Sequence, residues 1–324
     1  MTSWQAHAID AFIRLRYKRR LGRLAGAEAL ARARAILAGG PLRVPAGPVY
    51  RDDALGGVGG EWVSAPGPER RPALLYLHGG GYFTGSPKSH RPVTASLANA
   101  GFHVFAPHYR LAPEHPYPAA VDDAEAVWDG LLAAGASARG TVLAGDSAGG
   151  GLALALMIRL RDKGKPLPAA AALFSPWTDL AGTGESLRSN ARREAIFGAV
   201  GVRAAAAWYL GGAEPRLPEA SPYYAALKGL PPLMVEVGER ELLRDDSTRL
   251  ALRAAEAGVG VALEIWPVVP HGWQLACAFL PEARRSLARA ATFLRDRAEA
   301  LDPFGRGLMP ATGRRAGRAG APIG

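Results

Sequence analysis

One short segment constrains the fold of this chain more than any other. An apolar run from Thr141 to Ala144 is typical of a buried strand, and it is followed at once by the segment Gly145-Asp-Ser-Ala-Gly149. The next apolar run, from Leu152 to Leu160, is typical of a helix. A G-x-S-x-G pattern between a strand and a helix predicts a sharp turn that strains Ser147, because only glycines fit on either side of it. The helix N-terminus would favour negative charge at the serine oxygen, so we expect Ser147 to be a nucleophile.

Strand-like and helix-like segments alternate along the rest of the chain. After a hairpin region at 44–64, helices separate the strand-like segments, and no internal repeat is present. This alternation predicts an α/β fold with a mostly parallel sheet covered by helices on both faces. The expected strands are 73–77, 102–106, 141–144, 169–174, 233–237 and 261–266.

Composition excludes several classes of protein. The net charge of +10 suggests nucleic-acid binding, but much of the excess lies near the two ends, and no zinc-finger spacing or RNA-binding motif is present. No run of eighteen apolar residues could span a membrane, and the N-terminus does not match a secretory signal. Cys277 is the single cysteine, so no intramolecular disulfide can form. We therefore expect a cytoplasmic protein that binds no nucleic acid.

The two ends of the chain carry features of their own. Residues 3–21 have apolar side chains at helical spacing with a basic opposite face, and residues 25–37 predict a second helix. These helices could pack on the sheet, cover a site or anchor the chain to a membrane surface. We expect no membrane association, although the basic face leaves the anchor open. The basic Gly/Ala-rich tail at 304–324 is predicted to be disordered.

A glycine-rich turn follows the strand at 73–77 and has the sequence His78-Gly-Gly-Gly81. Its unshielded N–H groups could bind a developing oxyanion. A phosphate-binding loop is the alternative, but no Lys-Ser/Thr pair follows the glycines. We expect the N–H groups of Gly79, Gly80 and Ala148 to form an oxyanion hole.

A nucleophilic serine needs a base and an acid that orients the base. His271 lies in a loop after the last predicted strand and follows Ser147 in the chain, so it is the expected base. The acid should follow the strand at 233–237, where the candidates are Glu239, Glu241, Asp245 and Asp246. The two aspartates fall at the start of a helix, where acids are favoured by the dipole, whereas Glu241 lies in the loop itself.

Together these segments resemble the hormone-sensitive lipase family of α/β hydrolases, the bacterial family IV esterases. The resemblance runs from about residue 60 to 300. That family usually has Asp-x-Leu-x-Asp in its acid loop, thirty residues before the histidine, and this chain has Glu241-Leu-Leu-Arg-Asp245. The resemblance therefore implies Glu241 as the acid, with Asp245 as runner-up. The matching segments are 78–87, 109–120, 145–150, 175–180, 238–246 and 271–273.

The resemblance also implies a domain organisation. Residues 1–45 and an insertion at about 185–215 would form a helical cap over a catalytic domain at 46–303. Five aromatic side chains would then line the substrate pocket, namely Tyr82, Phe83, Phe197, Trp208 and Tyr209.

These observations predict a serine hydrolase of small carboxylic esters that requires no metal and no cofactor. A lactone hydrolase and an acetyl hydrolase would use the same groups, so both remain alternatives. A non-catalytic small-molecule binding module is a more remote one, because some relatives of this family act as receptors after losing the histidine that is present here. The expected partner is a small ester or lactone, and a homodimer stays open.

Overall fold

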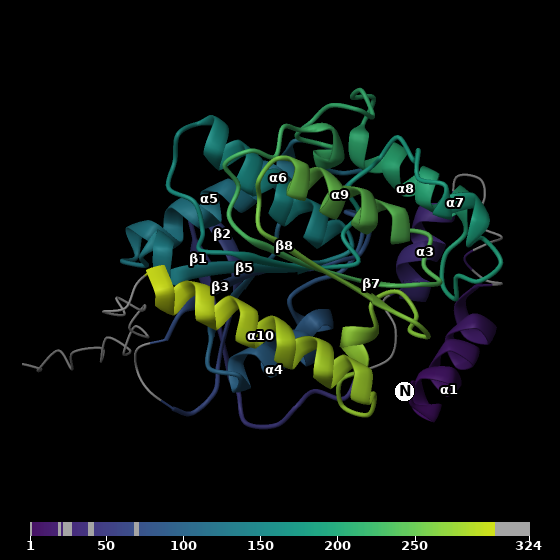
Figure 1. Ribbon diagram of the computed structural model, residues 1–324, viewed down its shortest axis with the longest axis horizontal. Coiled ribbons are helices and arrows are strands. Elements are labelled where there is room, and N and C mark those ends of the chain that lie inside the picture. The colour runs from purple at the N-terminus through teal and green to yellow at the C-terminus, as the bar shows by residue number, and fades with distance from the viewer. Residues whose placement is uncertain (1, 19–20, 22–27, 38–41, 68–70, 302–324) are drawn as a thin grey trace, which may run out of the picture.

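A single twisted sheet organises the chain in the computed structural model, which describes residues 2–18, 21, 28–37, 42–67 and 71–301. The sheet has eight strands in the order β1-β2-β4-β3-β5-β6-β7-β8 (Figure 1). Strand β2 pairs antiparallel with β1 and β4, and the remaining neighbours are parallel. The strands are β1 (Val49–Leu55), β2 (Val58–Ser64), β3 (Ala73–Leu77), β4 (His103–Pro107), β5 (Thr141–Asp146), β6 (Ala171–Phe174), β7 (Leu233–Gly238) and β8 (Val261–Trp266).

Helices cover both faces of the sheet, as the alternating pattern predicts. In Figure 1, α4 and α10 lie below the sheet and α5, α6 and α9 lie above it. Each face encloses its own buried apolar cluster. The predicted fold class, a mostly parallel α/β sheet flanked by helices, is confirmed. These helices are α4 (Arg91–Asn99), α5 (Ala119–Ala133), α6 (Ala148–Asp162), α9 (Arg244–Glu256) and α10 (Pro281–Leu301).

Two strand and helix boundaries differ from the prediction in ways that affect the site. Strand β5 continues through Gly145 and Asp146, because these residues pair with Leu173 and Phe174 of β6. The serine turn therefore begins immediately at the end of the sheet. The predicted insertion at about 185–215 contains two helices, α7 (Ser186–Ser189) and α8 (Ala199–Leu210), rather than one continuous helix.

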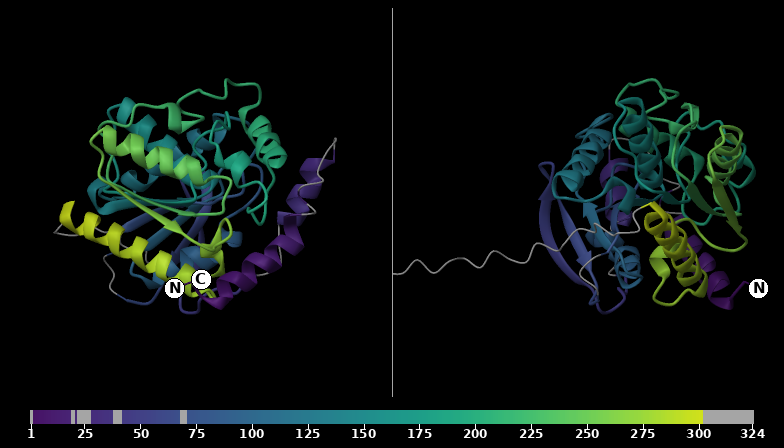
Figure 2. Two further views of the ribbon diagram at one scale, coloured as in Figure 1. Left: turned by 45° about the vertical axis from the view of Figure 1, so that its right-hand side comes forward. Right: turned by 60° about the vertical axis from the view of Figure 1, so that its left-hand side comes forward.

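The N-terminal segment lies along one side of the molecule (Figure 2). It contains α1 (Trp4–Ile13), the π-helix η1 (Arg14–Lys18) and α3 (Ala29–Leu37). Ser3 caps α1, since its Oγ accepts a hydrogen bond from the Ala6 N–H, and its own N–H and hydroxyl donate to the Glu282 carboxylate at 2.7 Å each. The start of α1 is thereby fixed to the first turn of α10. The predicted tail at 304–324 lies outside the described residues.

Candidate active site

Ser147 occupies the turn between β5 and α6. Its φ of 54° and ψ of −122° lie in a region that side-chain-bearing residues rarely adopt. The turn is tight, because a Cβ on Gly149 would lie 2.0 Å from the Leu77 carbonyl oxygen. The Ser147 N–H donates to the Phe174 carbonyl at 2.8 Å, which fixes the turn to β6. The strain predicted from the glycine pattern is therefore present in the backbone.

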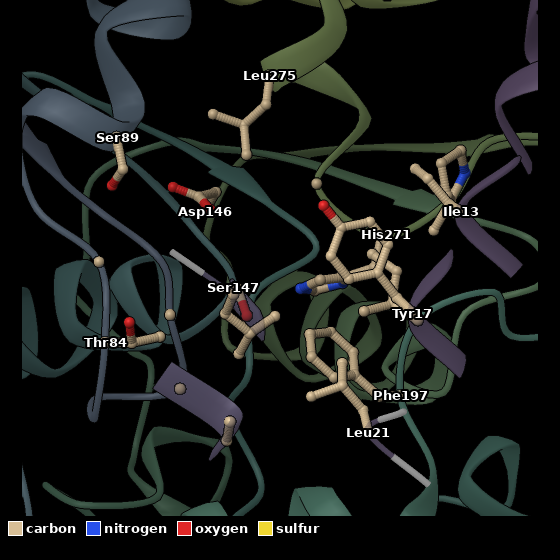
Figure 3. A pocket seen from close by; sticks show the side chains of 18 of the residues that line it. Ile13, Tyr17, Leu21, Thr84, Ser89, Asp146, Ser147, Phe197, His271 and Leu275 are labelled. Atoms are coloured by element: carbon tan, nitrogen blue, oxygen red, sulfur yellow. The ribbon is translucent and has the colours of Figure 1, made fainter. Parts of the chain in front are cut away.

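His271 and Glu241 form a short polar contact near this turn. Glu241 follows β7 and His271 follows β8, so both lie at the C-terminal ends of neighbouring parallel strands. His271 Nδ1 lies 2.6 Å from Glu241 Oε2, and both side chains are buried. His271 lines the same pocket as Ser147, and Figure 3 shows its ring turned toward that serine.

The electrostatic environment of His271 favours its protonated form. Burial lowers the pKa of His271, but the nearby carboxylates, Glu241 foremost and then Glu194 and Asp146, together raise it above 6.5. In the part of the chain that the structure describes, the Ser147 hydroxyl makes no hydrogen bond with the imidazole. Such bonds are often loose before substrate binds, and rotation about the serine Cα–Cβ bond can form one.

The other oxygen of the Glu241 carboxylate is held by two donors. Glu241 Oε1 accepts hydrogen bonds from the Gly238 N–H at 2.6 Å and the Ser175 hydroxyl at 2.7 Å. Asn190 of the turn after α7 donates to the Glu241 carbonyl at 2.9 Å. The residue that orients His271 is therefore itself fixed from two neighbouring segments. Sequence reasoning did not assign Ser175 a role, although it begins one of the segments that carry the family resemblance.

The alternative acids point elsewhere. Asp245 accepts a hydrogen bond from the Ser186 N–H at 2.8 Å and pairs with Arg244. Asp246 accepts the N–H groups of Thr178 and Asp179, each at 2.8 Å. Of the candidate acids, Glu241 is the one that the structure brings to His271.

The glycine-rich turn requires one correction to the expected oxyanion hole. The Gly79 N–H donates to Asp146 Oδ1 at 2.9 Å, so it is not available to a substrate. The same oxygen accepts the Tyr76 hydroxyl at 2.6 Å. Gly80 and Gly81 line the pocket with φ values of 119° and 60°, and their N–H groups make no hydrogen bond to any residue the structure describes.

Ala148 is the first residue of α6, where a helix leaves its N–H groups without intrahelical partners. The available donors near Ser147 are thus the N–H groups of Gly80, Gly81 and Ala148.

Two buried histidines support the glycine-rich turn. Burial lowers the pKa of His78 to about 3, so its ring stays neutral, and the ring stacks on Tyr109 with centroids 4.2 Å apart. His90 Nε2 lies 3.4 Å from Asp146 Oδ2. Burial lowers the pKa of His90, but Asp146 raises it above the ordinary value. These contacts give both rings a structural role at the glycine-rich turn.

A large cavity opens above Ser147. Its volume is about 950 Å³, and its lining is mainly apolar. Three of the five predicted pocket aromatics line it: Phe83, Phe197 and Trp208. The Phe197 ring meets the His271 ring edge-on with centroids 5.3 Å apart, and Phe83 meets Trp208 in the same way at 5.1 Å. These aromatic side chains form a wall beside the serine and the histidine.

The other two predicted pocket aromatics do not line the cavity. Tyr82 and Tyr209 stack on one another with ring centroids 3.7 Å apart, and both are buried rather than part of the lining. Their prediction as pocket residues is wrong. Neighbouring residues on a helix point about 100° apart, so Trp208 and Tyr209 of α8 cannot face the same way.

Comparison with known proteins identifies the fold family. Residues 74–275 match the protein family described as the alpha/beta hydrolase fold. The chain belongs to this α/β-hydrolase family. Among solved structures, a crystal structure of an esterase from the bacterial hormone-sensitive lipase family shares 40% identity with a TM-score of 0.84, covering 92% of this chain and 99% of that one. The family resemblance seen in the sequence is thereby confirmed.

Curated relatives of this α/β hydrolase include enzymes from several bacteria. An acetyl-hydrolase of Streptomyces hygroscopicus is 44% identical over 91% of this chain and 97% of its own length. An esterase of Acinetobacter venetianus is 37% identical over 74% of this chain and 79% of its own. A carboxylesterase/phospholipase of Mycobacterium tuberculosis is 37% identical over 76% of this chain and 69% of its own.

The N-terminal segment forms the outer wall of the hydrolase pocket. The sequence predicted that this segment could cover a site, but it did not indicate which of its residues would line the pocket. Ile13, Tyr17 and Leu21 line the cavity opposite Ser147 (Figure 3). Two basic side chains fix this wall to the segment after α7. Arg14 donates to the Arg192 carbonyl at 2.7 Å, and Lys18 donates to the Ala191 and Glu194 carbonyls at 2.8 and 2.6 Å.

Neither a metal site nor a membrane span is found among the described residues. Within the ranges given above, no group of three or more His, Cys, Asp or Glu side chains is placed to hold a metal ion. In the same part of the chain, no helix has the length and apolar character needed to cross a membrane.

Proposed function

We propose that this protein hydrolyses small carboxylic esters with Ser147 as nucleophile, His271 as general base and Glu241 as the acid that orients the base. The contact that carries the proposal is the 2.6 Å separation between His271 Nδ1 and Glu241 Oε2, in the pocket that also contains the strained Ser147. Its homologues include enzymes named esterase and carboxylesterase, and the chain is a carboxylic ester hydrolase.

The reaction follows from the protonation states. With Nδ1–H donated to Glu241, His271 Nε2 carries a lone pair and takes the Ser147 proton as the serine oxygen attacks the ester carbonyl. The imidazolium then gives that proton to the leaving alcohol, and an acyl-enzyme remains. Water attacks the acyl-enzyme with His271 again as base, which releases the carboxylic acid and restores the serine.

The negative charge on the substrate oxygen needs donors that are not already used. We assign this role to the N–H groups of Gly80, Gly81 and Ala148, and we give Gly79 the role of holding the loop through Asp146. Donors fixed before the reaction stabilise the transition state without reorganisation.

Acyl preference is the part of the function that the pocket shape decides. The 44% identity with a relative named acetyl-hydrolase supports a preference of this chain for short acyl groups. We propose that residues 1–45 and the insertion at about 185–215 act as the cap that limits the acyl chain, with Phe83, Phe197 and Trp208 at its inner surface. A lactone remains an alternative substrate for the same groups.

Hydrolysis of p-nitrophenyl acetate, butyrate, octanoate and palmitate beside a seven-membered lactone tests this function. Serine-dependent activity that is highest on the short esters is the expected result. Ser147→Ala should lower kcat by about 10⁴-fold or more while the thermal unfolding curve keeps its shape. Equal turnover by that variant would overturn the assignment. A fluorophosphonate probe that fails to label the wild type would favour a binding module instead.

A further inference from the structure

Helix α1 is apolar on two opposite sides. Its inner side places Ile9 and Ile13 in the lining of the cavity. Its outer side presents Trp4, which is 75% exposed, and Leu15 of the following turn is 74% exposed. Phe12 lies between the two sides, since it lines the cavity and is also 63% exposed. Large apolar side chains that lie exposed together on one side of a helix often mark a site of interaction. The outer side of this helix therefore has the character of a contact surface.

The helix is held to the protein by polar contacts. Ser3 is bound to Glu282 of α10 at one end, and Arg14 is bound to backbone carbonyls after α7 at the other. Between them, Asp10 Oδ2 lies 3.6 Å from Arg240. With its inner side held at both ends, the helix keeps its apolar outer side directed away from the protein.

This outer side is continuous with the mouth of the cavity. Phe12, Leu42 and Phe279 all line the cavity and are 63%, 46% and 51% exposed. Side chains that are both exposed and part of the lining mark the rim of the entrance. A second copy of the chain bound at this rim would block the entrance to the cavity. A lipid surface bound at the same rim would instead deliver substrate to the entrance.

The charges around the rim favour an anionic surface. Asp10 is the only acidic residue between positions 2 and 18, and it is buried, whereas Arg16 is exposed. Lys88 lines the cavity entrance and is also exposed. Apolar aromatic side chains flanked by basic ones suit the headgroup region of an anionic lipid layer.

We propose that the outer side of residues 4–16 docks this hydrolase on an anionic lipid–water interface, with the cavity mouth turned toward the lipid. Trp4, Phe12 and Leu15 would enter the boundary between headgroups and acyl chains, and Arg16 and Lys88 would meet the lipid phosphates. The proposal replaces the sequence-based expectation of no membrane association. It relies on the proposed function only for the supply of ester substrate, because docking itself needs no turnover.

Vesicle flotation of the full chain tests the docking directly. We compare vesicles of phosphatidylcholine alone with vesicles that also contain phosphatidylglycerol. The test variant is Trp4→Gln with Leu15→Gln, since neither residue lines the cavity. The matched control is Val49→Gln with Leu252→Gln, which are 68% and 61% exposed on other elements. We expect the wild type and the control to float with the anionic vesicles, and the test variant to bind at least about tenfold more weakly.

Three results would overturn the proposal: no flotation of the wild type with anionic vesicles, equal flotation of the test variant, or binding that does not depend on phosphatidylglycerol. A wild-type dimer that the test variant converts to a monomer, without vesicle binding, would assign this surface to a second copy. Turnover of dissolved p-nitrophenyl acetate, which we expect the test variant to retain, reports separately on the proposed function.

Discussion

The Gly79 N–H donates a hydrogen bond to Asp146 Oδ1 across 2.9 Å, so the residue before the proposed nucleophile holds the first glycine of the turn that faces it. Burial alone would raise the pKa of Asp146, but His90, together with the hydrogen bonds that Asp146 accepts, lowers it to about 2. The carboxylate is therefore ionised whenever the enzyme is folded near neutral pH. It fixes the turn relative to Ser147.

We expect Asp146→Ala to lower kcat for p-nitrophenyl acetate by about 10- to 100-fold with little change in KM, because the donors facing the oxyanion lose their alignment. Asp146→Asn keeps an oxygen that can accept the Gly79 N–H, so it should lower kcat much less. Steady-state kinetics with thermal unfolding as a fold control check this. Equal losses in both variants, or a change confined to KM, would contradict it.

The identity of the acid can be tested with two amide variants. Glu241→Gln should lower kcat by about 10³- to 10⁴-fold, because an amide cannot stabilise the imidazolium or hold the reactive tautomer of His271. Asp245→Asn should stay within about tenfold of the wild type, since that carboxylate is bound to Ser186 and Arg244 instead. A larger loss of kcat in Asp245→Asn than in Glu241→Gln would identify Asp245 as the catalytic acid.

The pH dependence of kcat/KM should report the environment of His271. Burial lowers the pKa of His271, but the nearby carboxylates, Glu241 foremost, raise it above the ordinary 6.5. The base must be neutral to accept the serine proton, so activity should rise with pH and reach half its plateau above pH 6.5. In Glu241→Gln the residual activity should reach half its plateau at lower pH. A wild-type midpoint at or below 6.5 would show that the carboxylates do not outweigh the effect of burial on the ring.

The same pKa shift has a consequence for stability. Because the pKa of folded His271 is raised, the stabilisation that it contributes is complete below the pKa of the unfolded chain, and it is lost as the pH rises through the folded value. Activity and this part of the folding free energy therefore change in opposite directions over one pH range.

The tight serine turn predicts a contrast between two glycines. Gly149→Ala places a Cβ 2.0 Å from the Leu77 carbonyl, so we expect a loss of several kcal/mol, on the order of 3, or no folded protein. Gly201→Ala lies inside α8 with nothing within 4 Å of the new atom, and it should stabilise by about 0.5–1 kcal/mol. Chemical denaturation measures both. Equal effects would show that the turn is more open than described.

The local sequence pattern was sufficient to predict the parallel strands and the candidate catalytic residues that follow them. The strand at 261–266 was predicted with its observed bounds, and His271 follows it in the loop where the sheet requires a base. Glu241 could be favoured over Asp245 because an acid in the first turn of a helix is stabilised by the dipole, whereas Glu241 lies in the preceding loop. The family resemblance added the spacing of thirty residues between acid and histidine.

Long-range contacts account for what the sequence could not predict. Whether the Gly79 N–H is available depends on Asp146, which lies 67 positions away. The assignment of Tyr82 and Tyr209 to the pocket failed because helix rotation and ring stacking, rather than residue type, decide which aromatic faces the cavity. The pocket wall contributed by Tyr17 likewise depends on how the N-terminal segment is attached.

That attachment sets which substitutions the pocket wall can tolerate. Arg14 and Lys18 hold the N-terminal segment through backbone carbonyl oxygens of residues 191–194 rather than through side chains. Every amino acid supplies such an oxygen, so side chains at 191–193 can vary widely while the acceptors persist. The attachment would be lost instead by changing the two basic donors, or by a deletion that shifts the carbonyls. Sequence variation among related enzymes should therefore be much freer at 191–193 than at positions 14 and 18.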